Sequence, residues 1–204
     1  KLKETGRLYE VYETIERPLM PVAERMNVDG VCLDKKALQA LKKEYSRELG
    51  EIAGRIFQYA GREFNINSTQ QLGVVLFDEL KITSGKLKKT ATGVRSTKEE
   101  ELAKLADAHP IVGDILAYRE LYKLLSTYVE KMAELIHKDG RLHAEFLQAG
   151  TTTGRMASQN PNLQNIPIRT EYGRRIRNAF KAPSGKKLVT IDYSQIELRV
   201  AAGL

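Results

Sequence analysis

The sequence contains one cysteine and three histidines, and it has no long apolar run. Cys32 cannot form an internal disulfide, and its spacing from the histidines is not that of a metal site. No apolar stretch approaches the roughly 18 residues of a membrane span, and the polar residues 1–6 lack the apolar core of a signal peptide. We therefore expect a protein of the reducing cytoplasm that does not insert into membranes.

The composition is that of a folded protein. Of the 204 residues, 42% are hydrophobic and 29% are charged, so enough apolar side chain is present to build a core. No internal repeat or low-complexity tract is present. The length allows one large domain or two small ones.

The net charge of +7 comes from two local segments. Residues 81–98 contain six basic and no acidic residues, and residues 174–187 contain six more basic residues and again no acidic one. Focused positive charge attracts polyanions, of which nucleic acid is the commonest. The alternative interpretation is two solvated lysine-rich loops, and composition alone leaves it open.

The first two thirds of the sequence have helical periodicity. Apolar residues recur at three- and four-residue steps from Leu8 to Met26, from residue 35 to Gly61, and from Pro110 to residue 135. The second of these helices would be about 40 Å long, so we expect it to project as an arm. Ser68 and Ser96 each open a capping-box pattern that predicts a shorter helix.

The pattern changes near residue 138, where we place a boundary. Alternating residues predict a short strand over 142–146, a basic helix follows over 171–180, and β-branched residues predict a strand over 188–191 that ends at Asp192. A further helix begins near residue 196. An aspartate at a strand end can bind a cation, or it can simply cap the next helix.

Three motifs resemble family A DNA polymerases. Residues 192–199, Asp-Tyr-Ser-Gln-Ile-Glu-Leu-Arg, resemble the first palm motif of that family, and residues 153–155 with 161–167 are similar to its primer-binding segment. Residues 123–128, Lys-Leu-Leu-Ser-Thr-Tyr, resemble its thumb motif, although Leu125 stands where the family often has lysine. The resemblance implies an α+β fold in which a long-helix thumb arm, residues 1–138 with a basic tip over about 81–98, precedes the start of an antiparallel-sheet palm, residues 139–204. The polymerase fold would be incomplete.

The resemblance also implies roles for the palm motif. Asp192 would be the catalytic residue and would ligate Mg²⁺, with the backbone carbonyl of Tyr193 as a further ligand, and no organic cofactor is expected. The deoxynucleoside triphosphate would be bound by Ser194, Gln195, Ile196 and Glu197. Glu197 would exclude a 2′-hydroxyl from the sugar site.

DNA contacts are implied in both parts of the chain. Near the primer terminus, Arg155, Asn162 and Gln164 would contact minor-groove acceptors, and Arg169 would hold a phosphate. In the arm and its tip, the residues implied to contact the duplex backbone are Lys88, Lys89, Thr90, Ser96, Lys123, Ser126, Thr127 and Tyr128. The partners would be primer–template DNA and deoxynucleoside triphosphates, and the location would be the nucleoid in the cytoplasm.

Several further residues are better explained by a structural role. We interpret Arg177 and Arg199 as structural ion-pair partners, Tyr118 and Tyr122 as core residues, and Cys32 as a small buried side chain. We expect His109 and His143 to be ordinary exposed or satisfied residues.

The resemblance further implies that the sequence is a piece of a polymerase, inactive alone, because fingers and a second palm carboxylate do not follow residue 204. The alternatives are a stand-alone duplex-DNA-binding module and a helical scaffold for protein partners, although the scaffold leaves the palm motif unexplained. An unpaired apolar strand over 188–191 also predicts self-association.

Overall fold

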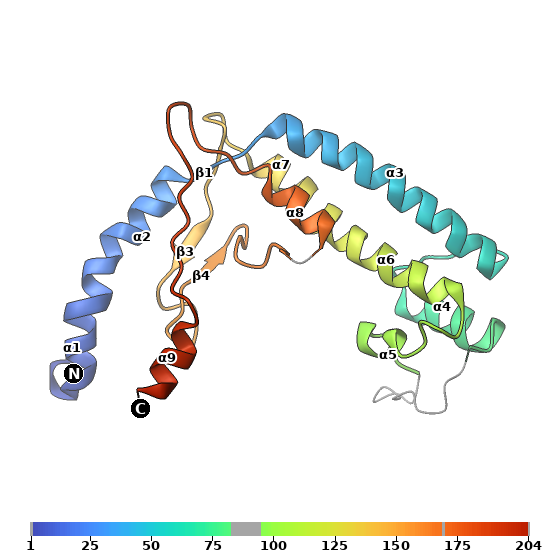
Figure 1. The fold of residues 1–204 in the computed structure, drawn as a ribbon, viewed down its shortest axis with the longest axis horizontal. Helices are drawn as coiled ribbons and strands as arrows, with labels where there is room; N and C mark the ends of the chain where they lie inside the picture. Colours follow the sequence, from blue (N-terminus) through green and yellow to red (C-terminus); the bar gives the residue numbers. More distant parts are fainter. Residues whose placement is uncertain (1, 83–94, 169, 204) are drawn as a thin grey trace.

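Two antiparallel helical segments form a long arm in the computed structural model, which describes residues 2–82, 95–168 and 170–203 (Figure 1). The outgoing helix is α3 (Lys35–Ala60). The returning segment is one continuous helix made of α6 (Pro110–Leu124), the π-helical stretch η4 (Leu125–Glu130) and α7 (Lys131–Leu135). The long projecting helix predicted after residue 34 is confirmed, whereas the bounds 1–138 of the thumb region stay a prediction.

Local chemistry sets both ends of α3. The carboxylate of Asp34 accepts a hydrogen bond from the backbone N–H of Ala37 at 3.1 Å, which satisfies one of the free donors of the first turn. Gly61 ends the helix with φ 70°, a left-handed conformation that glycine adopts without steric cost. The ring of His109 caps α6 by accepting from Ile111 N–H at 3.1 Å. This cap differs from the ordinary exposed or satisfied role expected for His109.

The hydrophobic core lies along the arm. The apolar faces of α3 and of the returning helix pack together, and the far end is closed by α4 (Thr69–Gly73), η3 (Val74–Glu79) and α5 (Glu99–Ala103). Fully buried side chains in this core include Leu38, Tyr45, Ile56, Leu76, Leu102, Ile115, Leu121 and Met132. Two ion pairs, Arg55–Asp114 at 2.6 Å and Lys42–Glu130 at 2.9 Å, link the helices at the surface.

The two predicted capping boxes form only in part. Ser68 caps α4 by accepting from Gln71 N–H at 3.3 Å, but the Gln71 side chain accepts from Asn65 N–H and not from Ser68. The cap predicted at Ser96 is wrong, because α5 begins at Glu99 and the Ser96 hydroxyl accepts from Lys98 N–H, two residues on. The intervening backbone has not yet entered the helix at that point.

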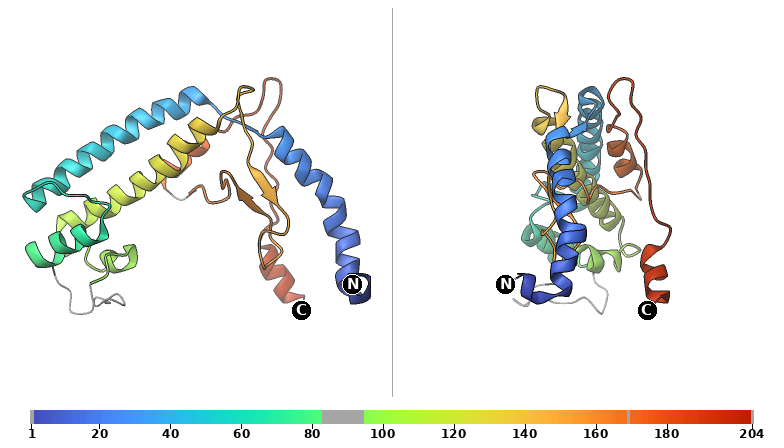
Figure 2. Two further views of the ribbon diagram at one scale, coloured as in Figure 1. Left: turned by 180° about the vertical axis from the view of Figure 1, so that it is seen from behind. Right: turned by 90° about the vertical axis from the view of Figure 1, so that its left-hand side faces the viewer.

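The N-terminal segment is a second long helix, on the opposite side of the base from the arm (Figures 1 and 2). After the short 3₁₀ turn η1 (Leu2–Thr5) it comprises α1 (Arg7–Val11), η2 (Tyr12–Glu16) and α2 (Arg17–Asp29), as its periodicity predicted. Most of its apolar face is exposed, and Ala23 is the buried residue within α2. The face contacts β3, and there Asn27 Oδ1 accepts from Phe146 N–H at 2.7 Å.

Two small antiparallel sheets form the base. In one, β1 (Val31–Cys32) pairs with β2 (Arg141–Leu142), with Val31 opposite Leu142. In the other, β3 (Glu145–Leu147) pairs with β4 (Ala157–Gln159), with Phe146 opposite Ser158. The strand predicted over 142–146 is therefore present as two short pieces. The mixed α+β class is confirmed.

The strand predicted over 188–191 is wrong. β-Branched residues favour an extended backbone, but a strand also needs a neighbour for its N–H and C=O groups, and none of the described strands pairs with this segment. Its apolar side chains are exposed, up to 89% at Ile191. The predicted self-association stays a prediction.

The final helices agree with the sequence pattern. Helix α8 (Glu171–Arg177) is capped by Thr170, whose hydroxyl accepts from Gly173 N–H at 3.2 Å, and it ends three residues earlier than predicted because Phe180 forms a β-bridge with Leu33. Helix α9 (Ile196–Ala202) follows a turn at the end of the exposed C-terminal segment. Among the described helices none is long and apolar enough to cross a bilayer. The boundary near residue 138 stays a prediction.

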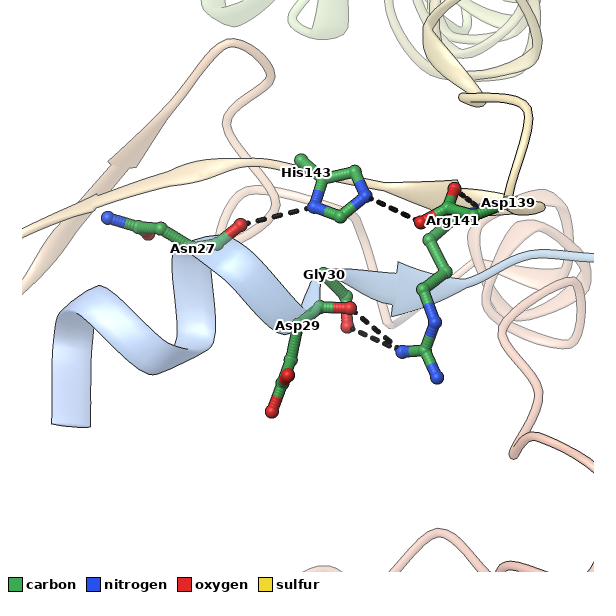
Figure 3. A network of polar contacts seen from close by, with 6 residues as sticks. All are labelled: Asn27, Asp29, Gly30, Asp139, Arg141 and His143. Atoms are coloured by element: carbon green, nitrogen blue, oxygen red, sulfur yellow. Dashed lines mark hydrogen bonds and ion pairs between the residues drawn. The ribbon is translucent and has the colours of Figure 1, made fainter.

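His143 joins the N-terminal helix to the base (Figure 3). Its Nδ1 lies 3.1 Å from the carbonyl oxygen of Asn27, and its Nε2 lies 3.0 Å from a carboxylate oxygen of Asp139. Both partners are acceptors, so both ring nitrogens donate only when the imidazole is protonated. The Asn27 carbonyl and then Asp139 raise the pKa of His143. The ring also crowds Gly30, where a Cβ would lie 2.7 Å from Nδ1.

Candidate nucleic-acid interface

The loop of residues 160–168 is held in shape by its own polar side chains. Ser158, which is buried, accepts from Leu163 N–H at 3.0 Å through its hydroxyl. The amide oxygen of Asn162 accepts from Gln164 N–H at 2.9 Å, and the Gln164 side chain donates to the Met156 carbonyl at 2.9 Å. We call residues 160–168 the primer loop. Asn162 and Gln164, both predicted to contact DNA, thus lie together on it.

The arm contacts the primer loop through Tyr128. This side chain is 6% exposed, and its hydroxyl donates to the carbonyl oxygen of Asn165 at 2.6 Å. Burial raises the pKa of Tyr128, so the phenol keeps its proton. The Tyr128 hydroxyl was predicted to contact the DNA backbone. In the structure it is instead bonded to another part of the protein.

The other arm residues of the thumb motif are more accessible. Lys123 and Thr127 are exposed, and the Ser126 hydroxyl donates to the Tyr122 carbonyl one turn earlier at 2.8 Å. A cleft of about 620 Å³ separates this surface from the primer loop, and Lys123, Tyr128 and Asn165 contribute to its lining. Charged side chains of both signs from the arm, Arg119 and Lys123 beside Glu99 and Glu120, and the amide of Asn165 from the loop therefore border one cleft.

The tyrosines before this motif are not both core residues. Tyr118 is half-buried and packs against the core, but Tyr122 is 41% exposed and stacks on Tyr118 with ring centroids 6.0 Å apart. The core assignment of Tyr122 is wrong, because the helix turns its position toward solvent while the stacked partner covers only one ring face.

The tip is only partly described. Lys88, Lys89, Thr90 and, in the primer loop region, Arg169 lie outside the described residues. Ser96 is 6% exposed and its hydroxyl is engaged with Lys98 N–H. Nearby, the guanidinium of Arg95 lies over the Phe77 ring, 5.3 Å from its centroid.

The second basic segment is used largely within the protein. Arg174 pairs with Glu171 at 2.9 Å, and Lys181 pairs with Asp34 at 3.3 Å. Within the described part of the chain Arg177 does not form the predicted ion pair, and its guanidinium donates to the Ile166 carbonyl at 3.5 Å. Lys186 and Lys187 are exposed. The helical half of this segment is therefore committed to contacts within the protein.

Helix α8 is clamped to the arm by a cluster that the sequence analysis did not identify. Arg175 forms a two-pronged ion pair with Glu44 and lies 5.8 Å from the ring centroid of Tyr45. The Tyr45 hydroxyl donates to the Tyr172 carbonyl at 2.8 Å, and burial raises the pKa of Tyr45 to about 12. The Tyr172 hydroxyl donates to Glu48. The partners in this cluster lie far apart in the sequence, so no local sequence pattern predicts their contacts.

The palm motif lies on an exposed turn and helix. Asp192 and Tyr193 are exposed, Ser194 and Gln195 form the turn, and Ile196 begins α9. Arg199, predicted to be an ion-pair partner, pairs with no acidic side chain among the described residues, and its Nε donates to the Ser194 carbonyl at 2.8 Å. Gln195 has φ 52°, an uncommon left-handed conformation for a residue other than glycine. Its side chain makes no capping hydrogen bond to the first turn of α9.

One contact brings the palm motif to the residues before the primer loop. A guanidinium nitrogen of Arg155 lies 3.2 Å from a carboxylate oxygen of Glu197, across 42 residues of sequence. The two motifs that the sequence analysis identified separately are therefore adjacent.

The palm motif offers a divalent cation ligands of suitable chemistry, but only a few of them. The Asp192 carboxylate and the Tyr193 carbonyl are hard oxygen donors of the kind that Mg²⁺ prefers. No group of three or more potential ligands among His, Cys, Asp and Glu occurs in the described part of the chain. The donor chemistry fits Mg²⁺, whereas a two-metal site needs further carboxylates.

Comparisons with known proteins agree with this arrangement. The family model described as DNA polymerase family A matches residues 35–204. The chain is 52% identical over 206 aligned positions to the thermostable DNA polymerase I of Thermus thermophilus, covering 100% of this chain and 24% of the relative. It is 49% identical to DNA polymerase I of Treponema pallidum, covering 98% of this chain and 20% of the relative.

A solved structure is similar over nearly the whole chain. The polymerase domain of Pol1 from M. smegmatis, in complex with DNA primer–template and dNTP, superposes with a TM-score of 0.87 at 36% identity, covering 98% of this chain and 35% of that one. Arm, loop and palm motif together are thus those of a nucleic-acid polymerase. The chain belongs to DNA polymerase family A, and it spans about a quarter of the length of the first of these curated relatives.

Proposed function

We propose that this chain acts in a DNA-directed DNA polymerase that adds deoxynucleoside monophosphates to a primer 3′-OH in replication and repair. Its own part is to hold the primer–template duplex and to supply the first catalytic carboxylate. The contact between Arg155 and Glu197 carries the proposal, because it sets the palm motif beside the residues that lead into the primer loop. The family membership of the chain supports the same conclusion.

Asp192 and Tyr193 would hold Mg²⁺ in this function. The bound cation would supply positive charge that stabilises the charge developing during phosphoryl transfer. Asp192 is exposed at a turn, so its carboxylate is free to reach such an ion. The incoming deoxynucleoside triphosphate would lie over residues 194–197, with Glu197 against the sugar, where its carboxylate excludes a 2′-hydroxyl.

The duplex would lie along the exposed surface of the arm and against the primer loop. Lys123, Ser126 and Thr127 would contact the DNA backbone, together with Arg169 and the tip residues Lys88, Lys89 and Thr90. Arg155, Asn162 and Gln164 would contact minor-groove acceptors, which are present in every correct base pair and so give no sequence preference. The expected location is the cytoplasm, at the nucleoid.

Fluorescence anisotropy of a labelled recessed primer–template tests DNA binding. Titration with the chain at two salt concentrations should give an affinity that falls steeply as salt rises, because each phosphate contact releases counterions. Lys123→Gln should weaken binding and reduce the salt slope, whereas Lys36→Gln, an exposed lysine in the first turn of α3, should do neither. Absence of binding at low salt would contradict the proposal.

The chain alone should not incorporate nucleotides. A two-metal site needs at least two well-placed carboxylates, and the palm motif supplies Asp192. Primer extension assayed with Mg²⁺ and all four deoxynucleoside triphosphates should therefore give no product. Magnesium-dependent extension by the purified chain would refute this expectation.

A further inference from the structure

We infer that Tyr128 is a positioning residue that fixes the primer loop against the arm, and not a phosphate contact. Its hydroxyl donates at 2.6 Å to the carbonyl oxygen of Asn165, 37 residues further along the chain. The link to DNA contact rests on the proposed function, but the positioning itself is a property of the free protein.

The surroundings of Tyr128 support this role. The ring is packed within the arm core and only 6% of the residue is exposed. A phosphate contact would require the phenol to leave that core and to give up its bond to Asn165. On the same helix, Lys123 and Thr127 are exposed and need no rearrangement to contact a phosphate.

Adjacent contacts hold the loop at the same place. The carbonyl of Ile166 accepts from Arg177, and the Ile166 side chain is buried in the core. Gly173 packs so closely on the loop that a Cβ there would lie 2.4 Å from the Pro167 carbonyl oxygen. Tyr128 supplies a hydrogen bond from the arm, and Arg177 and Gly173 supply contacts from α8.

The consequence concerns Asn162 and Gln164. The Asn162 side chain is oriented by a bond within the loop and the Gln164 side chain by a bond to the Met156 carbonyl, and the loop is attached to the arm through Asn165. Arm contacts to phosphate and loop contacts to the minor groove therefore have one fixed spacing, and Tyr128 contributes the hydrogen bond from the arm that fixes it.

The first test uses the free protein. Tyr128→Phe removes only the hydroxyl, and loss of one hydrogen bond should speed amide exchange at Leu163 and Gln164 by about fivefold or more. Exchange in α3 should be unchanged. Tyr59→Phe is the matched control, because Tyr59 is exposed and its contact with His109 is made by the ring. Unchanged exchange in the loop, or equal acceleration throughout the arm, would overturn the inference.

The second test couples Tyr128 to the minor groove. Anisotropy is measured with two primer–templates, one carrying 3-deazaguanine at the primer terminus, which lacks the minor-groove nitrogen acceptor. The full chain should bind the modified DNA several-fold more weakly, and Tyr128→Phe should lose most of this discrimination. A purely structural role would lower both affinities equally and leave their ratio unchanged, which would overturn the inference.

The two tests separate the inference from the function on which it rests. If the unsubstituted chain binds neither DNA, or binds both equally, the proposed minor-groove contact fails. Amide exchange in the free protein then still decides whether Tyr128 positions the loop.

Discussion

A guanidinium nitrogen of Arg155 lies 3.2 Å from a carboxylate oxygen of Glu197, although both side chains are largely exposed, at 76% and 73%. Such an exposed pair contributes little to folding. Its effect is on the electrostatics of the interface, because Glu197 neutralises a cation that is proposed to contact DNA. The ion pair would have to open when primer–template binds.

Glu197→Gln should therefore raise the affinity for primer–template. The substitution frees Arg155 and removes a negative charge near the path of the duplex, so the dissociation constant at low salt should fall about two- to fivefold. Thermal stability should not change. Anisotropy titration measures the effect, and Glu171→Gln, which releases Arg174 from a similar exposed pair on α8, is the control. Weaker binding by Glu197→Gln would show that the carboxylate itself helps to hold DNA.

His143 should make stability depend on pH. Its pKa is raised in the folded protein, so protonation favours folding. This contribution is complete below the unfolded pKa of about 6.5 and is lost as the pH rises through the higher folded value. Urea unfolding at a series of pH values above 6 should show the loss, and His143→Gln should abolish it. His109→Asn, which keeps an acceptor at the cap of α6, should retain it. A pH profile unaffected by His143→Gln would contradict the prediction.

Two glycine substitutions should act in opposite directions. A Cβ at Gly173 would meet the Pro167 carbonyl oxygen at 2.4 Å, so Gly173→Ala must displace the primer loop, at a cost of about 1–3 kcal/mol in unfolding free energy. Gly54 on α3 has open space around its Cβ position, so Gly54→Ala should stabilise the chain by about 0.5–1 kcal/mol. Chemical denaturation compares the two. Equal effects would mean that α8 does not press on the loop.

The exposed segment 188–191 should promote association between copies of the chain. Leu188, Val189 and Ile191 present apolar side chains on a backbone that no described strand pairs. Light scattering should give an apparent mass that rises with concentration, and Val189→Lys should reduce it. A monomeric mass at high concentration would refute the prediction.

Features that depend on neighbours within a turn or two could be predicted from the sequence. The cap at Asp34, the stop at Gly61 and the periodicity of α3 are local, so the arm was predicted with its ends. The capping residue His109 could have been found from its place before Pro110. Ser96 shows the limit of this approach, because a capping pattern names a candidate but burial and the local backbone decide where the helix begins.

The sequence by itself determined the family, through motifs of consecutive residues, and the helices of the arm, through apolar spacing and caps. Tertiary structure alone decided that Tyr128 faces Asn165, that Arg155 meets Glu197 and that Arg175 clamps α8 to the arm. It also decided that residues 188–191 pair with none of the strands in the described part of the chain. The physical reason is range: caps and periodicity depend on residues within a few positions, whereas these contacts join residues tens of positions apart and arise only when the helices pack.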